Sequence, residues 1–289
     1  MPQVSPELER RLMVAVERMP AFPKSVQAIL DMSRNLNCSP KSMVAVIEKD
    51  PVMTVKILRV INSAYYSLPN KVNSVGQSVV YLGINTVKNL ALAMAAVGIL
   101  PRFNAAGFDI QRYLLHSLTV AAVARLLCEK YASDSADPGD CYVAGLLHDF
   151  GKVVFAQFMS AEFALALART VERGAPLHSA EAEIIGADHA YVGALLAQRW
   201  QFGMELVNCI RDHHAPDAAP APMLDCLRLA DALCRKRAYG NSGNPWRDGE
   251  QIELPARFGG DVEAVVATLG DLDKLVEDAS RFAQIGTEG

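Results

Sequence analysis

Helical periodicity runs through nearly the whole chain and restricts the fold more than any other feature of the sequence. Between residues 109 and 132, for example, Val120, Val123 and Leu127 recur every three or four positions and so share one helical face. No segment shows the strict alternation of apolar and polar residues that is typical of a half-buried strand. The chain is therefore predicted to be all-α.

Capping residues divide this periodicity into separate helices. Asp50 directly precedes Pro51, which pairs an N-cap with a proline in the first helical turn. In that helix Val52, Val55 and Leu58 run along one face. Beyond a break at 101–108, long helices are predicted at 109–132, 138–159, 160–173, 179–200, 203–214 and 222–237, followed by a loop at 239–250 and a helical tail at 261–282.

The composition is that of a globular protein of the cytoplasm. Hydrophobic residues make up 51% of the 289 residues and charged residues 21%, which is typical of a chain that buries a core. The N-terminus lacks the apolar stretch of a signal peptide, and the longest apolar run, Leu90 to Leu100, is too short to cross a membrane. The six cysteines include no CxxC pair, which predicts reduced thiols.

The charge pattern argues against binding to nucleic acid. The net charge is -4, so the whole protein does not attract a polyanion. Residues 39–60 have the rhythm of a helix-turn-helix, but Glu48 and Asp50 stand where a basic face would be needed.

All six histidines lie between residues 116 and 214. The stretch AGLLHDFGKVVF even places His148 and Asp149 side by side within an apolar run. Five of the histidines, together with two aspartates, occupy inward-facing positions of the predicted helices: His116, His148, Asp149, His189, His213, His214 and Asp231.

Seven such residues together predict a metal site. A single buried imidazole is usually a hydrogen-bonded core residue, but buried carboxylates cost several kcal/mol unless they are paired or bind a metal. Imidazole and carboxylate together suit a divalent ion, with Fe or Mn favoured, Ni or Zn as alternatives, and one or two ions in the site. His178 follows a GAPL turn at a helix start and is predicted to be a surface or capping residue.

The order of these residues resembles a known pattern. His116, His148-Asp149 and Asp231 resemble the H…HD…D ligands of the HD superfamily of metal-dependent phosphohydrolases. The N-terminal half is more specific: MPAFPKSVQAIL, VIEKDPVMTVKILRVINSAYYS and VNSVGQSVVYLGINTVKNLAL resemble the HDOD domain, a bacterial signalling relative of the HD and HD-GYP families. The segments EAEIIGADHAYVGALLAQRW and IRDHH continue this resemblance, which covers about residues 15–237.

The resemblance implies a helical HDOD fold and a bacterial regulator. Residues 1–105 would form an N-terminal helical subdomain packed on an HD-type bundle at 106–240, with a loop and helical tail at 241–289. Many HDOD proteins look catalytically degenerate and are treated as interaction modules. The implied partner is an unidentified signalling protein or a phosphate-containing ligand, and the oligomeric state is left open.

In this chain the implied ligand set is complete. Asp149 would bridge two ions, with one group of residues on each: His116, His148 and Asp231 on the first, and His189, His213 and His214 on the second, as in HD-GYP proteins. The chain departs from HD-GYP in two places. No Gly-Tyr-Pro loop follows His214, and Arg112 stands in place of the glutamate that would support a third metal.

Two functions remain open at this point. The first is a signalling module that retains its metal site. The alternative is a metal-dependent phosphohydrolase or phosphodiesterase acting on a nucleotide or cyclic dinucleotide, with Asp149 and Lys152 as catalytic residues. Lys152 would contact a phosphate as a point charge, unless it is a helix-surface lysine, and Arg112 is a weaker candidate for the pocket mouth.

The NSAYY stretch at 62–66 has two interpretations of its own. Asn62 is predicted to cap a helix C-terminus, with Tyr65 and Tyr66 packing onto the second subdomain. The alternative is that this helix end roofs the metal pocket and limits the size of its substrate.

Overall fold

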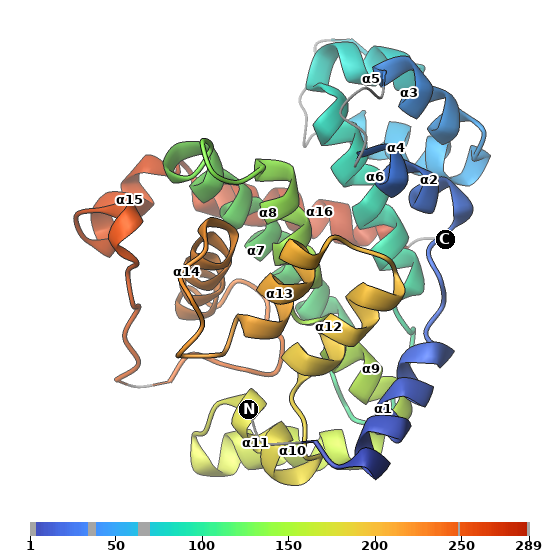
Figure 1. Cartoon of the computed structure of the whole chain (residues 1–289). Coiled ribbons are helices and arrows are strands. Elements are labelled where there is room, and N and C mark those ends of the chain that lie inside the picture. The colour runs from blue at the N-terminus through green and yellow to red at the C-terminus, as the bar shows by residue number, and fades with distance from the viewer. Residues whose placement is uncertain (1–3, 34–38, 63–69, 248, 288–289) are drawn as a thin grey trace. The chain divides into compact units, whose positions relative to one another are not determined.

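The fold consists of helices joined by loops (Figure 1). The computed structural model describes the chain except for residues 1–3, 34–38, 63–69, 248 and 288–289. No strand occurs in this described part, so the all-α prediction is confirmed. Among the same residues, no helix combines the length and the apolar character needed to cross a membrane.

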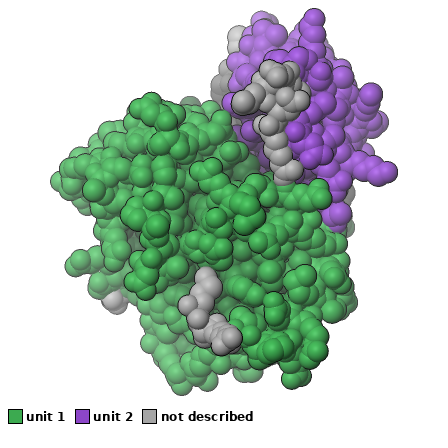
Figure 2. All heavy atoms as spheres, in the orientation of Figure 1, with its two compact units in different colours: residues 1–20, 100–276 green, residues 21–99, 277–289 purple. Residues whose placement is uncertain are grey.

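The chain forms two compact units, which Figure 2 distinguishes by colour. Unit 1 comprises residues 1–20 and 100–276, and unit 2 comprises residues 21–99 and 277–289. The division near residue 100 is close to the predicted subdomain boundary. The first twenty residues thus share a unit with residues 100–276, and the last thirteen share one with residues 21–99.

Unit 2 holds the helices that follow the first segment of the chain. They are α2 (Lys24–Ser33), α3 (Pro40–Glu48), α4 (Pro51–Ile61), α5 (Val75–Leu82) and α6 (Ile84–Ile99), with the end of α16 (Leu272–Thr287). The predicted cap of α4 is present, because Asp50 Oδ1 accepts a hydrogen bond from the Met53 backbone N–H at 3.0 Å.

The buried face of α4 is not the one that carries Val52 and Val55. Met53, Ile57 and Val60 are buried, whereas Val52 and Val55 are about two-thirds exposed, at 66% and 64%. The helix carries two apolar rows, and α4 packs against α3, α5 and α6 with only one of them. The local pattern allowed either row, and the tertiary contacts selected one.

Asn62 ends α4 as predicted. Its Nδ2 donates to the carbonyls of Leu58 at 2.9 Å and Val72 at 2.7 Å, and its Oδ1 accepts from the Val72 N–H at 2.7 Å. The side chain therefore caps the helix and joins its end to the backbone of Val72. Tyr65 and Tyr66 lie outside the described residues.

Unit 1 contains the longer helices and all six histidines. Its elements are α1 (Pro6–Arg18), α7 (Ile110–Tyr131), α8 (Pro138–Leu147), α9 (Phe150–Phe158), α10 (Ser160–Arg173), α11 (Leu177–Ile184), α12 (His189–Arg199), α13 (Met204–Asp212), α14 (Pro222–Lys236), the 3₁₀ turn η1 (Ala256–Phe258), α15 (Val262–Thr268) and the start of α16. The buried α7 packs against α8 and α14, while α12 packs against α9 and α13.

Two helices predicted as continuous are interrupted, and both predictions are wrong in this respect. The predicted helix at 138–159 is divided into α8 and α9, with His148 and Asp149 between them. The predicted helix at 179–200 is divided into α11 and α12, where Gly186 adopts a positive φ of 92°. Apolar periodicity continues across both interruptions, so it does not reveal them.

Close backbone contact between helices explains two glycines. A Cβ at Gly145 of α8 would collide with the backbone of Ala121 in α7. A Cβ at Gly151 of α9 would collide with the carbonyl of His189, the first residue of α12. These two positions therefore allow the helices that carry the histidines to approach one another.

Hydrogen bonds from the end of α12 connect α1 to the rest of unit 1. Arg199 donates from Nη1 to the Met19 carbonyl at 2.7 Å and from Nη2 to the Glu17 carbonyl at 2.9 Å. Trp200 Nε1 donates to the Pro20 carbonyl at 3.2 Å. These donors satisfy carbonyls that the C-terminus of α1 leaves without helical partners, which explains why the first twenty residues belong to unit 1.

Candidate metal centre

Asp149 lies at the middle of the histidine cluster, in the short connection between α8 and α9. It is 2% exposed, and its two carboxylate oxygens face different groups of residues. Oδ2 lies 3.3 Å from His148 Nε2 and 3.9 Å from His116 Nε2. Oδ1 lies 3.1 Å from His189 Nε2 and 3.8 Å from His213 Nε2.

The first group combines α7, the end of α8 and α14. Potential ligand atoms of His116, His148 and Asp149 all lie within 4.8 Å of one another. Asp231 of α14 adjoins this group, because its Oδ1 lies 3.1 Å from His116 Nε2 and 3.8 Å from His148 Nε2. The structure thus brings together the four residues expected to hold one ion.

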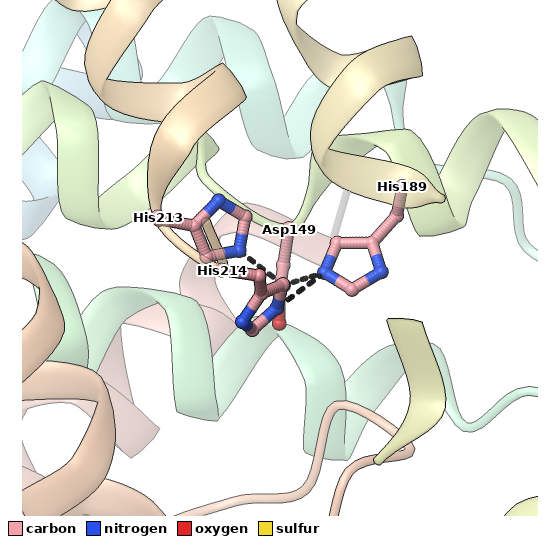
Figure 3. Close-up of side chains that lie close together, drawn as sticks. All are labelled: Asp149, His189, His213 and His214. Carbon is pink, nitrogen blue, oxygen red and sulfur yellow. Dashed lines mark hydrogen bonds and ion pairs between the residues drawn. The ribbon is translucent and has the colours of Figure 1, made fainter. Parts of the chain in front are cut away.

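The second group combines Asp149 with histidines from α12 and the end of α13. Ligand atoms of Asp149, His189, His213 and His214 also lie within 4.8 Å of one another. Figure 3 shows the three imidazoles gathered around the Asp149 carboxylate. The Nε2 atoms of His189 and His214 are 3.0 Å apart. These are the residues expected to hold a second ion.

The ring orientations are fixed from the outside of the cluster. His148 Nδ1 donates to the Gly145 carbonyl at 2.8 Å, and His213 Nδ1 donates to the Ile210 carbonyl at 2.6 Å. Since the δ nitrogen carries the proton, a neutral ring keeps the lone pair of its ε nitrogen. Both Nε2 atoms are buried and have no hydrogen-bond partner.

These unpartnered nitrogens fit a metal better than a hydrogen-bonded core. A buried polar atom without a partner is costly, and groups of this kind are normally satisfied. Imidazole nitrogens and carboxylate oxygens in two groups that share one carboxylate are a suitable donor set for two divalent ions. The residues present therefore fit the metal that the sequence predicted.

Glu181 of α11 holds His189 and was not found by sequence reasoning. It is fully buried, and its Oε2 accepts hydrogen bonds from the His189 backbone N–H at 2.9 Å and from Nδ1 at 2.5 Å. A carboxylate on the outer nitrogen of a metal-binding histidine is a common supporting arrangement. The only signal in the sequence was an acidic residue eight positions before a histidine, a spacing that bridges the interruption between two helices.

Arg228 of α14 supports His213 and His214 through the backbone. Its Nε donates to the His213 carbonyl at 3.2 Å, and its Nη2 donates to the Asp212 carbonyl at 2.7 Å and to the Ala215 carbonyl. These carbonyls belong to the C-terminal end of α13, where helical partners are lacking. Arg228 therefore fixes the turn that carries both histidines.

Lys152 is not a helix-surface residue. It is 1% exposed, and its Nζ donates to Asp149 Oδ2 at 2.7 Å and to Ser242 Oγ at 3.1 Å. The ammonium group balances part of the negative charge at the centre of the cluster. Arg112, the weaker candidate for the pocket mouth, is exposed, and its backbone carbonyl accepts from the Asn241 N–H at 3.0 Å.

His178 is closer to the site than the sequence predicted. Its ring stacks on His214 with 4.3 Å between ring centroids and 20° between ring planes. It is half-buried, and its Nδ1 is buried without a hydrogen-bond partner. His178 lies at the start of α11, as the GAPL turn predicted, and its ring contacts the cluster through His214.

The electrostatics of the cluster keep both carboxylates ionised. Burial opposes ionisation of Asp149, but the neighbouring His148 and the Lys152 ammonium outweigh it and hold the pKa of Asp149 well below its ordinary value. Burial likewise opposes ionisation of Asp231, where the Arg235 guanidinium prevails and lowers the pKa. Two carboxylates in the interior therefore remain anionic at neutral pH.

The histidines differ in their affinity for protons. Burial lowers the pKa of His213 and of His214 well below the ordinary value, so both are neutral near pH 7. Burial acts in the same direction on His189, but the Glu181 carboxylate overcomes it and raises the pKa of His189 to about 9. His189 must therefore release its ε proton before that nitrogen can bind a metal.

The helices of unit 1 bring together a buried H…HD…H…HH…D cluster, the residue order that resembles the HD superfamily. The model of the HDOD domain matches residues 19–216, which is more than half of the chain. The chain therefore belongs to the HDOD domain family. Asp231 and the segment that follows it lie beyond the matched residues.

Similar proteins agree with this assignment. A solved HDOD domain protein of unknown function from Geobacter sulfurreducens is 26% identical, with a TM-score of 0.79, over 96% of this chain and 99% of that one. A solved candidate phosphohydrolase from Shewanella amazonensis SB2B is 25% identical, with a TM-score of 0.69, over 96% of this chain and 97% of that one.

A curated relative is longer than this chain. An uncharacterized protein of Treponema pallidum is 26% identical over 223 residues, which are 76% of this chain and 43% of that protein. The chain thus spans less than half the length of this relative.

Proposed function

We propose that this protein is a regulatory module of bacterial signal transduction whose HD-type centre holds two divalent metal ions, iron or manganese. The observation that carries the proposal is the position of Asp149, whose two oxygens face two separate groups of histidines. The first ion would be held by His116, His148 and Asp231, and the second by His189, His213 and His214. Asp149 would be shared between them.

The contacts around the candidate metal centre would favour tight binding of the metal ions. Three of the imidazoles are oriented through their outer nitrogens by Gly145, Ile210 and Glu181. Supports of this kind raise the affinity of a site for its metal. Two divalent ions in such a centre would lower the pKa of a bound water and neutralise the charge of a phosphate oxygen.

Two features favour regulation over turnover. The Gly-Tyr-Pro loop of HD-GYP proteins is absent from the sequence after His214. Lys152, the candidate phosphate contact, is engaged by Asp149 and Ser242 within the interior. The metal would then stabilise one conformation of unit 1, and a separate signalling protein in the cytoplasm would recognise that conformation.

Hydrolysis of a phosphate ester is the second candidate function. It is supported by a pocket of about 340 Å³ that is lined by His214 and Asp231, one residue from each group of metal ligands. The similarity to the Shewanella candidate phosphohydrolase also favours this alternative. The same metal centre would serve both functions.

Metal content is the experiment that tests the proposal. The protein would be purified without oxygen and without a nickel column, and its metals measured by elemental mass spectrometry. We expect about two equivalents of Fe or Mn in the wild type and a loss of both in Asp149→Asn, because that residue is shared. Asp134→Asn, which removes an exposed carboxylate before α8, should retain the wild-type content.

The outcomes separate the candidate functions. Wild-type protein without metal, or Asp149→Asn with an unchanged content, would overturn the metal centre. Metal-loaded protein that hydrolyses generic phosphate mono- and diesters would favour the hydrolase. Metal-loaded protein without turnover would favour the regulatory module.

A further inference from the structure

A pocket of about 340 Å³ opens beside the candidate metal centre. His214 and Asp231 line it together with residues of α14 and of the segment 251–255. Because these two residues come from different groups of metal ligands, an occupant of the pocket would lie next to both. The volume is near the lower end of the range for small-molecule sites, roughly 300–1,000 Å³.

Two arginines line this pocket, and only one of them is suited to a ligand. Arg228 donates to three backbone carbonyls at the end of α13 and so has a structural task. Arg235 also lines the pocket, and its Nε donates to Asp231 Oδ2 at 3.0 Å. Its Nη1 is buried and has no hydrogen-bond partner.

The remaining edge of the Arg235 guanidinium is occupied by a carboxylate of the chain itself. Glu250 Oε1 lies 2.7 Å from Arg235 Nη2, and Arg247 Nε lies 3.2 Å from Glu250 Oε2. Burial opposes ionisation of Glu250, but the hydrogen bond and charge of Arg235 lower its pKa, so it is anionic at neutral pH. The guanidinium thus already binds an anion next to the metal centre.

We propose that the pocket binds the phosphate group of a small phosphorylated ligand, and that this phosphate takes the place of the Glu250 carboxylate on Arg235. A guanidinium binds phosphate and carboxylate through the same paired N–H groups. The inference deepens the proposed function, since the metal ions would bind the phosphate from one side and Arg235 from the other. The pocket volume favours a ligand the size of a mononucleotide over a larger one.

Phosphate binding by charge-matched variants tests this displacement. Inorganic phosphate would be titrated calorimetrically into the full-length, metal-loaded wild type, Glu250→Gln and Glu263→Gln. Glu263 is an exposed residue of α15 that does not line the pocket and forms no ion pair among the described residues. We expect Glu250→Gln to tighten phosphate binding about tenfold, which is about 1.4 kcal/mol, and Glu263→Gln to change it less than about twofold.

A double-mutant cycle shows whether the effect passes through Arg235. The gain from Glu250→Gln should disappear when Arg235→Gln is also present. Equal gains in Glu250→Gln and Glu263→Gln would show a general charge effect and overturn the proposal, as would no gain at all. If Arg235→Gln fails to fold, the comparison of the two glutamate variants decides by itself.

Metal analysis of the same samples separates this inference from the proposed function. Metal-loaded protein without the expected difference between the glutamate variants would overturn only the Arg235 site. Protein that holds no metal would overturn the proposed function, and the same titrations on that protein would still decide whether phosphate displaces Glu250.

Discussion

At the scale of single residues, the cluster depends on groups that hold the ligands as much as on the ligands themselves. Glu181, Arg228 and Lys152 each contact a ligand or its backbone, and each is buried or part-buried. Their charges also decide the protonation of the cluster, as the pKa of His189 illustrates. Substitutions at such positions should alter metal affinity without removing a ligand.

Removal of the charge from Glu181 should weaken the second ion. Glu181→Gln keeps an acceptor for His189 but loses the carboxylate that orients the ring and raises its basicity. We expect metal affinity to fall about 10- to 100-fold, measured by competition with a chelator. Glu183→Gln on the same helix, whose exposed carboxylate pairs with Arg169, is the matched control and should leave the affinity unchanged.

The stacking of His178 on His214 should contribute to the position of that ligand. His178→Ala removes the stacked ring and is expected to lower metal affinity about tenfold, whereas His178→Phe keeps an aromatic ring and should stay close to the wild type. Both affinities would be measured with the same chelator competition. An equal loss in both variants would show instead that His178 binds metal directly.

At the scale of elements, five of the seven cluster residues lie at the ends of helices, whereas His116 and Asp231 lie within α7 and α14. His148 and Asp149 lie where α8 gives way to α9, His189 begins α12, and His213 follows α13. The close approach of α9 to α12 at Gly151 keeps two of these ends together.

A methyl group at position 151 should separate α9 from α12. In Gly151→Ala the new Cβ meets the His189 carbonyl, so the helices must move apart. We expect the free energy of unfolding to fall by about 1–3 kcal/mol and metal content to decrease, measured by urea denaturation and elemental analysis. Gly98→Ala in α6, where nothing lies within 4 Å of the added Cβ, should be neutral or stabilising.

At the scale of the whole molecule, the metal centre belongs to one of two compact units. All of its residues lie in unit 1, between His116 and Asp231. A metal that binds only the folded state stabilises it in proportion to the logarithm of its concentration over the dissociation constant. Metal binding should therefore raise the free energy of unfolding of unit 1.

Removal of the metal should lower the thermal stability of the protein. If the free metal concentration is 1,000 times the dissociation constant, the free energy of unfolding should fall by about 4 kcal/mol when a chelator removes the metal. Differential scanning calorimetry should show one transition that moves to lower temperature with chelator and recovers when Fe or Mn is added. Asp149→Asn should show no response to either addition, and an unchanged wild-type transition would contradict the prediction.

The metal-free protein should be most stable near pH 6.5. Below that value the unfolded chain takes up protons that the buried His213 and His214 cannot, because their pKa values are lowered, so stability falls with acidification. Above it, native His189 with a pKa of about 9 keeps a proton that the unfolded chain has lost, so stability falls as pH rises towards 9.

Urea denaturation of metal-free protein at a series of pH values would measure this profile. Glu181→Gln is expected to flatten the alkaline side, because it removes the charge that raises the pKa of His189. A wild-type stability that increases steadily from pH 6.5 to 9 would contradict the assignment.

The sequence by itself determined the all-α class, the capped start of α4 and the identity of the clustered histidines and aspartates. These follow from local signals: side-chain periodicity, an N-cap before a proline, and ionisable residues on apolar faces. Each signal spans only a few residues, so a single chain segment carries it completely.

Only the tertiary structure decided which apolar row of α4 is buried, where the helices at His148 and before His189 are interrupted, and that His178 joins the cluster. It also supplied Glu181 for His189 and paired Arg235 with Glu250. The physical reason is that burial and pairing depend on contacts between segments distant in sequence. Helical periodicity continues unchanged through a helix end, and it carries no information about the partner that a buried charge will find.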